Sequence, residues 1–134
     1  ALADADQPVI AAGGGGIPVM EQGSHLKGAS AVIEKDRAAG LLAKELDADV
    51  LMFITGVPNV VLNYGSDHPI NIDKMTTADA ARYAEEGHFK TGSMLPKVES
   101  SIDFINAGKG RRAIITSLDG AKSALAGKGG TTIQ

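Results

Sequence analysis

Short apolar runs, each about the length of one β-strand, alternate along this chain with segments whose apolar residues recur at helical spacing. Strands are predicted at residues 8–12 (PVIAA), 49–55 (DVLMFIT), 60–64, 112–117 (RAIITS) and 131–133. Helices are predicted over residues 33–46, 76–86, 93–106 and 118–126. Residues 17–32 are expected to form an exposed hairpin or flap. The strongest strand runs are continuously apolar, as in strands that are covered on both faces. The sequence therefore predicts an α/β fold with a mainly parallel sheet between helical layers.

Composition narrows the classes of protein that fit. With 134 residues, 43% hydrophobic side chains and a net charge of -3, the chain fits one ordinary soluble domain rather than a disordered segment. No apolar run is long enough for a membrane span, and the mildly acidic balance argues against nucleic-acid binding. Cysteine is absent, which excludes a thiolate zinc site and a Cys nucleophile and favours a cytoplasmic protein.

Four consecutive glycines follow the first predicted strand: Gly13, Gly14, Gly15 and Gly16. Without a Cβ, their backbone can adopt positive φ and approach an anion, so the run is a candidate loop for a phosphate or carboxylate. It is not a P-loop, because no GK[ST] follows, and Pro18 stands where a dinucleotide-binding fingerprint would begin its helix. A flexible turn is the alternative.

Two lysines near predicted helix starts are candidates for phosphate chemistry. Lys35 and Asp36 open one helix, where a cation can neutralise a transferring phosphate and an acid can position that cation. Residues 92–97 (GSMLPK) lead into another helix, whose first turn is expected to present free N–H groups. Lys97 adds positive charge where the helix dipole disfavours it, which indicates an anionic partner. A solvated Lys–Asp pair and a surface lysine are the alternatives.

The remaining titratable groups carry weaker signals. The three histidines lack metal-ligand spacing, and we interpret them as surface or packing residues: His25, His68 and His88. No metal site and no Ser/His/Asp triad is predicted. A small basic cluster before the strand at 112–117 is interpreted as solvated surface: Lys109, Arg111 and Arg112.

Longer motifs resemble a known family. The runs are AAGGGGIPV (residues 11–19), AVIEKDRAAGLLAKELDADVL (31–51), EEGHFKTGSMLPKVES (85–100), AIITSLDGA (113–121) and GGTTI (129–133). In this order and spacing they resemble the C-terminal half of the carbamate kinases, which are members of the amino acid kinase superfamily. The resemblance covers essentially the whole chain, and its specificity comes from the EKDRAAGLLAKEL and GHFKTGSMLPKVES segments.

The resemblance implies a three-layer αβα sandwich in which residues 1–134 form one nucleotide-binding domain, without the N-terminal acceptor lobe. It implies reversible phosphoryl transfer between ATP and carbamate, giving ADP and carbamoyl phosphate, with Mg²⁺. Lys35 and Lys97 match the phosphate-neutralising lysines and Asp36 the acid that orients them, while glycines 13–16 match the loop facing the transfer site. The family's nucleotide pocket corresponds to Thr55, Gly56, Val57, Tyr64, Ser93 and Met94.

By the same resemblance, the full-length protein is expected to be a homodimer that acts on small molecules in arginine metabolism or allantoin degradation. The nucleotide-binding half alone is expected to turn over poorly, because in-line transfer needs both lobes. Two alternatives stay open. One is a non-catalytic nucleotide-binding or regulatory module, and the other is a superfamily kinase with a uridylate or amino-acid acceptor. Lys35, Asp36 and Lys97 together favour an enzyme, and GHFKTGSMLPK favours carbamate.

Overall fold

A four-stranded sheet organises the computed structural model, which describes residues 2–134. Its strand order is β3-β7-β8-β6, where β3 is Val50–Thr55, β7 Arg112–Ser117, β8 Thr131–Ile133 and β6 Lys74–Met75. The β3–β7 and β6–β8 pairs are parallel, and the β7–β8 pair is antiparallel. The predicted α/β class with a mainly parallel sheet is confirmed. Two small antiparallel pairs stand outside this sheet: β1 (Val19–Gln22) with β2 (His25–Gly28), and β4 (Val60–Leu62) with β5 (Ile70–Ile72).

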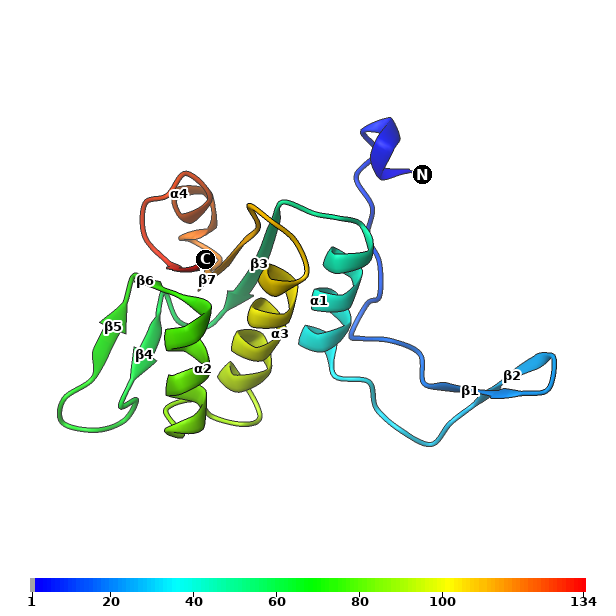
Figure 1. Ribbon diagram of the computed structural model, residues 1–134, viewed down its shortest axis with the longest axis horizontal. Helices are drawn as coiled ribbons and strands as arrows, with labels where there is room; N and C mark the ends of the chain where they lie inside the picture. The colour runs from blue at the N-terminus through cyan, green and yellow to red at the C-terminus, as the bar shows by residue number, and fades with distance from the viewer. Residues whose placement is uncertain (1) are drawn as a thin grey trace.

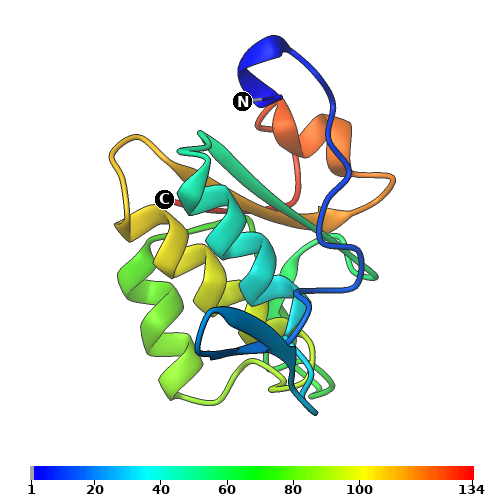
Figure 2. The ribbon, with the colours of Figure 1, turned by 90° about the vertical axis from the view of Figure 1, so that its right-hand side faces the viewer.

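Helices cover the sheet on two sides and give the three layers expected of the fold (Figures 1 and 2). On one side lie α1 (Lys35–Glu45), α2 (Thr77–Glu85) and α3 (Met94–Asn106), and α4 (Ala121–Leu125) lies on the other. A short 3-10 turn, Ala3–Ala5, precedes them in the chain. The main core fills the space between the sheet and the three-helix side, with Phe53, Val98 and Phe104 at its centre.

The strands differ in how far they are covered. In the central strand β7, Ala113, Ile114 and Ile115 are all fully buried, so both faces are covered as predicted. In β3 burial alternates, and Ile54 is exposed. The expectation that residues 49–55 are covered on both faces is therefore wrong, because β3 is an edge strand of this sheet and its second face is only partly covered.

The predicted strand at residues 8–12 is wrong. These residues form no strand, and the Ile10 side chain is fully exposed. Within residues 2–134 no strand lies beside them to pair with, so their backbone N–H and C=O groups gain nothing from extended ladder geometry. The predicted hairpin within residues 17–32 is confirmed, and β1–β2 projects from the body of the molecule (Figure 1).

Helix ends follow local chemistry. Thr76 and Asp79 form a complete capping box at the start of α2, and Gly87, at φ +80°, follows its end.

The basic cluster before β7 is not all solvated, contrary to expectation. The Arg111 side chain is only 7% exposed, donates to Asp47 at 2.5 Å and lies over the Phe104 ring, so that part of the interpretation is wrong.

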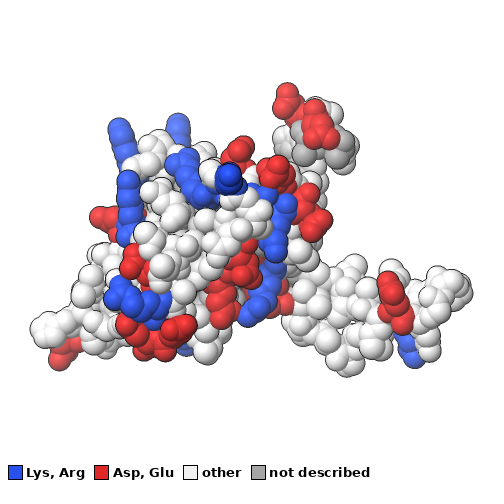
Figure 3. Space-filling view, viewed as in Figure 1, with Lys and Arg blue, Asp and Glu red and all other residues white. Residues whose placement is uncertain are grey.

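Charged residues of both signs lie next to one another over the face shown in Figure 3. Arg82 and Asp79 form an exposed ion pair. None of the helices described in residues 2–134 combines the length and apolar character needed to cross a bilayer.

Candidate active site

A buried ion pair joins the first turns of α1 and α3. Lys97 Nζ donates to Asp36 Oδ2 at 2.7 Å, across a separation of 61 residues in sequence. The two side chains are only 9% and 8% exposed. Removing charges from water is costly unless they are paired, so each of these groups fixes the position of the other. Lys97 is thus not the solvated surface lysine of the alternative interpretation.

Helix packing brings this pair together. Gly40, one turn after Asp36, faces Ser100, almost one turn after Lys97. A Cβ built on Gly40 would lie 3.0 Å from the Ser100 Cβ, which is tighter than ordinary side-chain contacts. The missing side chain therefore lets α1 and α3 approach closely where Asp36 and Lys97 meet.

Lys35 joins the same cluster from a more exposed position. Its Nζ lies 3.7 Å from Asp36 Oδ2 and donates to Glu34 Oε1 at 3.2 Å, and the side chain is 57% exposed. The hydrogen bond to Glu34 and the charge of Asp36 raise the pKa of Lys35, so its amine stays cationic. Two ammonium groups thus converge on one carboxylate, one of them buried and the other open to solvent.

The glycine run lies beside this cluster. Gly15, at φ +144°, packs so closely that an added Cβ would be 2.6 Å from the Ile33 carbonyl oxygen and 3.6 Å from Lys35 Cα. Gly16 approaches the Ile33 side chain in the same way, whereas a Cβ on Gly13 or Gly14 would meet open space. The loop therefore rests on the chain that enters α1, although the strand predicted before it is not formed.

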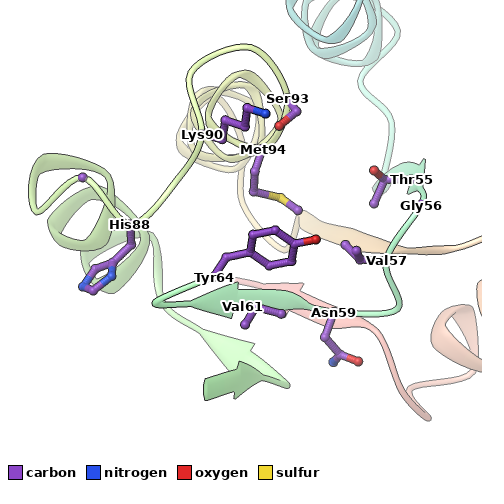
Figure 4. A pocket seen from close by; sticks show the side chains of 11 residues that line it. Thr55, Gly56, Val57, Asn59, Val61, Tyr64, His88, Lys90, Ser93 and Met94 are labelled. Carbon is purple, nitrogen blue, oxygen red and sulfur yellow. The ribbon is translucent and has the colours of Figure 1, made fainter. Parts of the chain in front are cut away.

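A cavity of about 560 Å³ opens beyond the carboxyl end of β3 (Figure 4). All six residues predicted for a nucleotide pocket line it, and in the close-up Tyr64 and Met94 extend toward one another. Sequence reasoning missed the remaining lining residues: Asn59, Val61, Gly87, His88 and Lys90. Three of these five lie in the EEGHFK part of the motif before α3, which was the available signal.

Two of the missed residues bring nitrogen-bearing side chains to the cavity wall. His88 was interpreted as a surface or packing residue. It does pack edge-on against Tyr83 and lies 3.3 Å from Glu86, but it also forms part of the cavity wall. Lys90 has no ionic or hydrogen-bonding partner for its ammonium group within the described part of the chain. An unpaired cation on a cavity wall suits an anionic ligand.

The expectation of free N–H groups at the start of α3 is wrong. The backbone N–H groups of Ser93, Met94 and Leu95 all point to the Lys90 carbonyl oxygen, at 3.1 Å each. Pro96 has no N–H, and the Ser93 side chain makes no capping bond. The tight turn thus satisfies the donors that a helix start normally leaves open, and any anion held here depends on side chains.

Metal ligands are sparse. In the region from residue 2 to 134, no three His, Asp or Glu side chains come together in a group that could hold a metal ion.

The α/β domain thus combines converging lysines, a glycine loop beside them and a cavity at a strand end, an arrangement that offers positive charge to an anionic ligand. The sequence model of the amino acid kinase family matches residues 1–117, and the chain belongs to this family.

Individual relatives narrow the comparison. The chain is 51% identical to the carbamate kinase-like protein YqeA of Escherichia coli (strain K12) over 133 residues, which is 99% of this chain and 43% of that protein. It is 50% identical to the carbamate kinase of Thermococcus kodakarensis over 125 residues, covering 93% of this chain and 39% of the relative. It is similar to the solved carbamate kinase of Giardia lamblia bound to AMP-PNP, with a TM-score of 0.85 and 42% identity over 90% of this chain and 38% of that one. The chain thus spans less than half the length of these relatives.

Proposed function

We propose that this chain is the nucleotide-binding half of a carbamate kinase, an enzyme that transfers a phosphoryl group reversibly between ATP and carbamate. The observation that carries the proposal is the convergence of Lys35 and Lys97 on Asp36, next to the glycine loop. The relatives at 50–51% identity and the structural likeness to an AMP-PNP complex support it.

Different residues would bind the base and the phosphates of the nucleotide. The adenosine part would occupy the cavity between Tyr64 and Met94, and the phosphates would extend toward the starts of α1 and α3. Met94 and Lys97 are three residues apart on α3, so they lie on neighbouring positions of one helix face. The lysine cluster does not line the cavity itself, but Lys97 lies about one helical turn from the cavity residue Met94.

Positioning and electrostatic stabilisation are the main contributions that a protein makes to phosphoryl transfer. Lys97, held by Asp36, would supply a fixed positive charge at the transferring group. Lys35, which is more exposed and is not held in a buried pair, would follow that group as it passes from donor to acceptor. The glycine loop beside Lys35 would let backbone come close to the same phosphate.

Mg²⁺ would reach this site together with the nucleotide. Within residues 2–134 no three His, Asp or Glu side chains form a group that could hold the ion by themselves. Mg²⁺ commonly keeps several waters and binds through substrate phosphates, and it would enter here as the ATP complex. The resemblance to the carbamate kinases also supports a cytoplasmic homodimer as the form of the full-length protein.

Nucleotide binding by the chain itself is the first test. Calorimetric titration with ATP and Mg²⁺ should show binding, and Lys35→Met should weaken ATP affinity about tenfold while affinity for adenosine is unchanged. Lys109→Met, which removes an exposed lysine outside the cavity, is the matched control and should bind as the unaltered chain does. Absence of ATP binding, or equal losses for ATP and adenosine, would contradict the proposal.

The acceptor needs the full-length protein. ATP formation from ADP and carbamoyl phosphate, followed by a coupled luciferase assay, should far exceed transfer with uridylate or amino-acid acceptors. The nucleotide-binding half alone should show little transfer. A full-length protein that binds ATP and transfers to none of these acceptors would be the regulatory module of the alternative hypothesis.

A further inference from the structure

Glu34 makes two contacts that the proposed reaction does not explain. Its Oε2 accepts a hydrogen bond from the Arg37 backbone N–H at 2.8 Å, which caps α1, and its Oε1 accepts one from Lys35 Nζ at 3.2 Å. Most N-cap side chains are short, and a glutamate reaches the Lys35 amine while it caps. The longer side chain thus ties the exposed lysine of the site to the helix start.

The charges of this cluster cancel when no ligand is bound. Lys35 and Lys97 supply two positive charges, and Glu34 and Asp36 supply two negative ones. Asp36 is committed to Lys97 at 2.7 Å and is 3.7 Å from Lys35, so the closest anionic contact of Lys35 is Glu34. A polyphosphate must therefore compete with the Glu34 carboxylate for the Lys35 amine.

Both members of this contact are ionised near neutral pH. Partial burial favours the neutral form of Glu34, but hydrogen bonds from the Arg37 N–H and the Lys35 amine outweigh it and lower its pKa. The pKa of Lys35 is raised, chiefly by the same hydrogen bond. The competition is thus between two full negative charges, one of the protein and one of the ligand.

We propose that Glu34 is a positioning residue that withdraws Lys35 from the phosphate site. Building on the proposed function, it holds the amine while the site is empty, releases it to the nucleotide phosphates, and takes it back as the nucleotide leaves. Glu34 thereby limits affinity for phosphorylated ligands and speeds their dissociation.

Glu34→Gln tests this with little change in shape. The amide oxygen still accepts from the Arg37 N–H, but the charge that competes for Lys35 is lost. Exposed ion pairs of this kind are weak, so ATP and inorganic tripolyphosphate should bind about two- to fivefold more tightly and dissociate more slowly. Adenosine affinity should be unchanged, because adenosine has no phosphate.

Two further variants separate competition from other effects. Glu45→Gln removes the same charge from the last residue of α1, about 15 Å from Lys35 along the helix axis. Salt screens charges over that distance, so this variant should bind tripolyphosphate as the unaltered chain does. In a Lys35→Met background, Glu34→Gln should bring no further tightening.

The outcomes are distinguishable from those of the proposed function. If the unaltered chain fails to bind ATP, the nucleotide-binding proposal fails. If that chain binds ATP but Glu34→Gln leaves affinity equal or weaker, or tightens adenosine as much as tripolyphosphate, the role of Glu34 is refuted alone. Tightening that persists without Lys35 also refutes it.

Discussion

Separating the buried pair of Asp36 and Lys97 should cost more than any other single change in the site. Lys97→Met keeps an unbranched side chain of similar length, which the neighbouring Phe53 ring, 5.8 Å from Nζ, can accommodate. Asp36→Asn keeps the shape and removes the charge. Each single variant leaves the other member of the pair as a buried charge, whereas the double variant leaves none.

The structure sets different magnitudes for the two single variants. Breaking a buried ion pair on one side typically costs about 3–5 kcal/mol. Asp36→Asn should fall in that range, because Asp36 is the anionic partner of Lys97 within residues 2–134. Lys97→Met should cost about 2–3 kcal/mol, less than that range, since Lys35 at 3.7 Å still offsets part of the Asp36 charge. The double variant should lose only about 1–2 kcal/mol, so the coupling between the two sites is at least about 3 kcal/mol.

Urea unfolding of the four proteins measures this coupling. With a slope of about 1–3 kcal/mol per M, a loss of about 3 kcal/mol moves the midpoint by roughly 1–3 M, which is easily resolved. Additive losses, with a coupling below about 0.5 kcal/mol, would refute the reasoning. The pair would then not be one energetic unit, and the fixed position of Lys97 would need another cause.

Three further predictions concern packing, capping and the cavity. Gly40→Ala should lower the free energy of unfolding by about 1–3 kcal/mol in urea melts, because the added Cβ would lie 3.0 Å from Ser100 Cβ on α3. The control Gly28→Ala, with open space around the added Cβ, should cost less than about 1 kcal/mol. The Thr76 hydroxyl bond lowers the pKa of Asp79, so its contribution is present above pH 3.8 and lost as the pH falls through the lowered value. The melting temperature of Asp79→Asn should therefore lie below that of the unaltered chain at pH 6, and the gap should close as the pH falls through the lowered pKa of Asp79. Lys90→Met should weaken ATP binding about fivefold in calorimetry and leave adenosine binding unchanged, and a loss for both ligands would assign Lys90 to the fold instead.

Local signals predicted the elements that local chemistry decides. The helices at α1, α2 and α3 begin within two residues of their predicted starts, because caps and apolar spacing lie within a few residues of one another. The strands β3 and β7 are predicted correctly because their signal, a continuous apolar run, is local as well. The short strands β5 and β6 were missed, because two or three residues carry no periodic pattern and their pairing depends on strands distant in the sequence.

The error at residues 8–12 has the opposite cause. An apolar run can form a strand only where a second strand supplies partners for its backbone, and no such strand lies beside it in residues 2–134. Periodicity measures the preference of a segment and not the presence of its neighbours. The same limit applies to Arg111. Its side chain is covered through contacts with Asp47, which is distant in the sequence, and with Phe104, which lies in the preceding helix α3.

The lysine cluster shows where sequence and structure contribute differently. Sequence predicts Lys35 and Lys97 as equivalent cations near helix starts, because it contains neither their distances nor their burial. The structure makes them unequal: Lys97 is buried and tied to Asp36, while Lys35 is exposed and tied to Glu34. A reaction that moves a phosphoryl group over a few ångströms benefits from both kinds of charge, because a fixed one defines the path and a mobile one can follow the group along it. Loss of either charge should therefore slow the transfer step, and loss of the exposed Lys35 charge should in addition weaken phosphate binding.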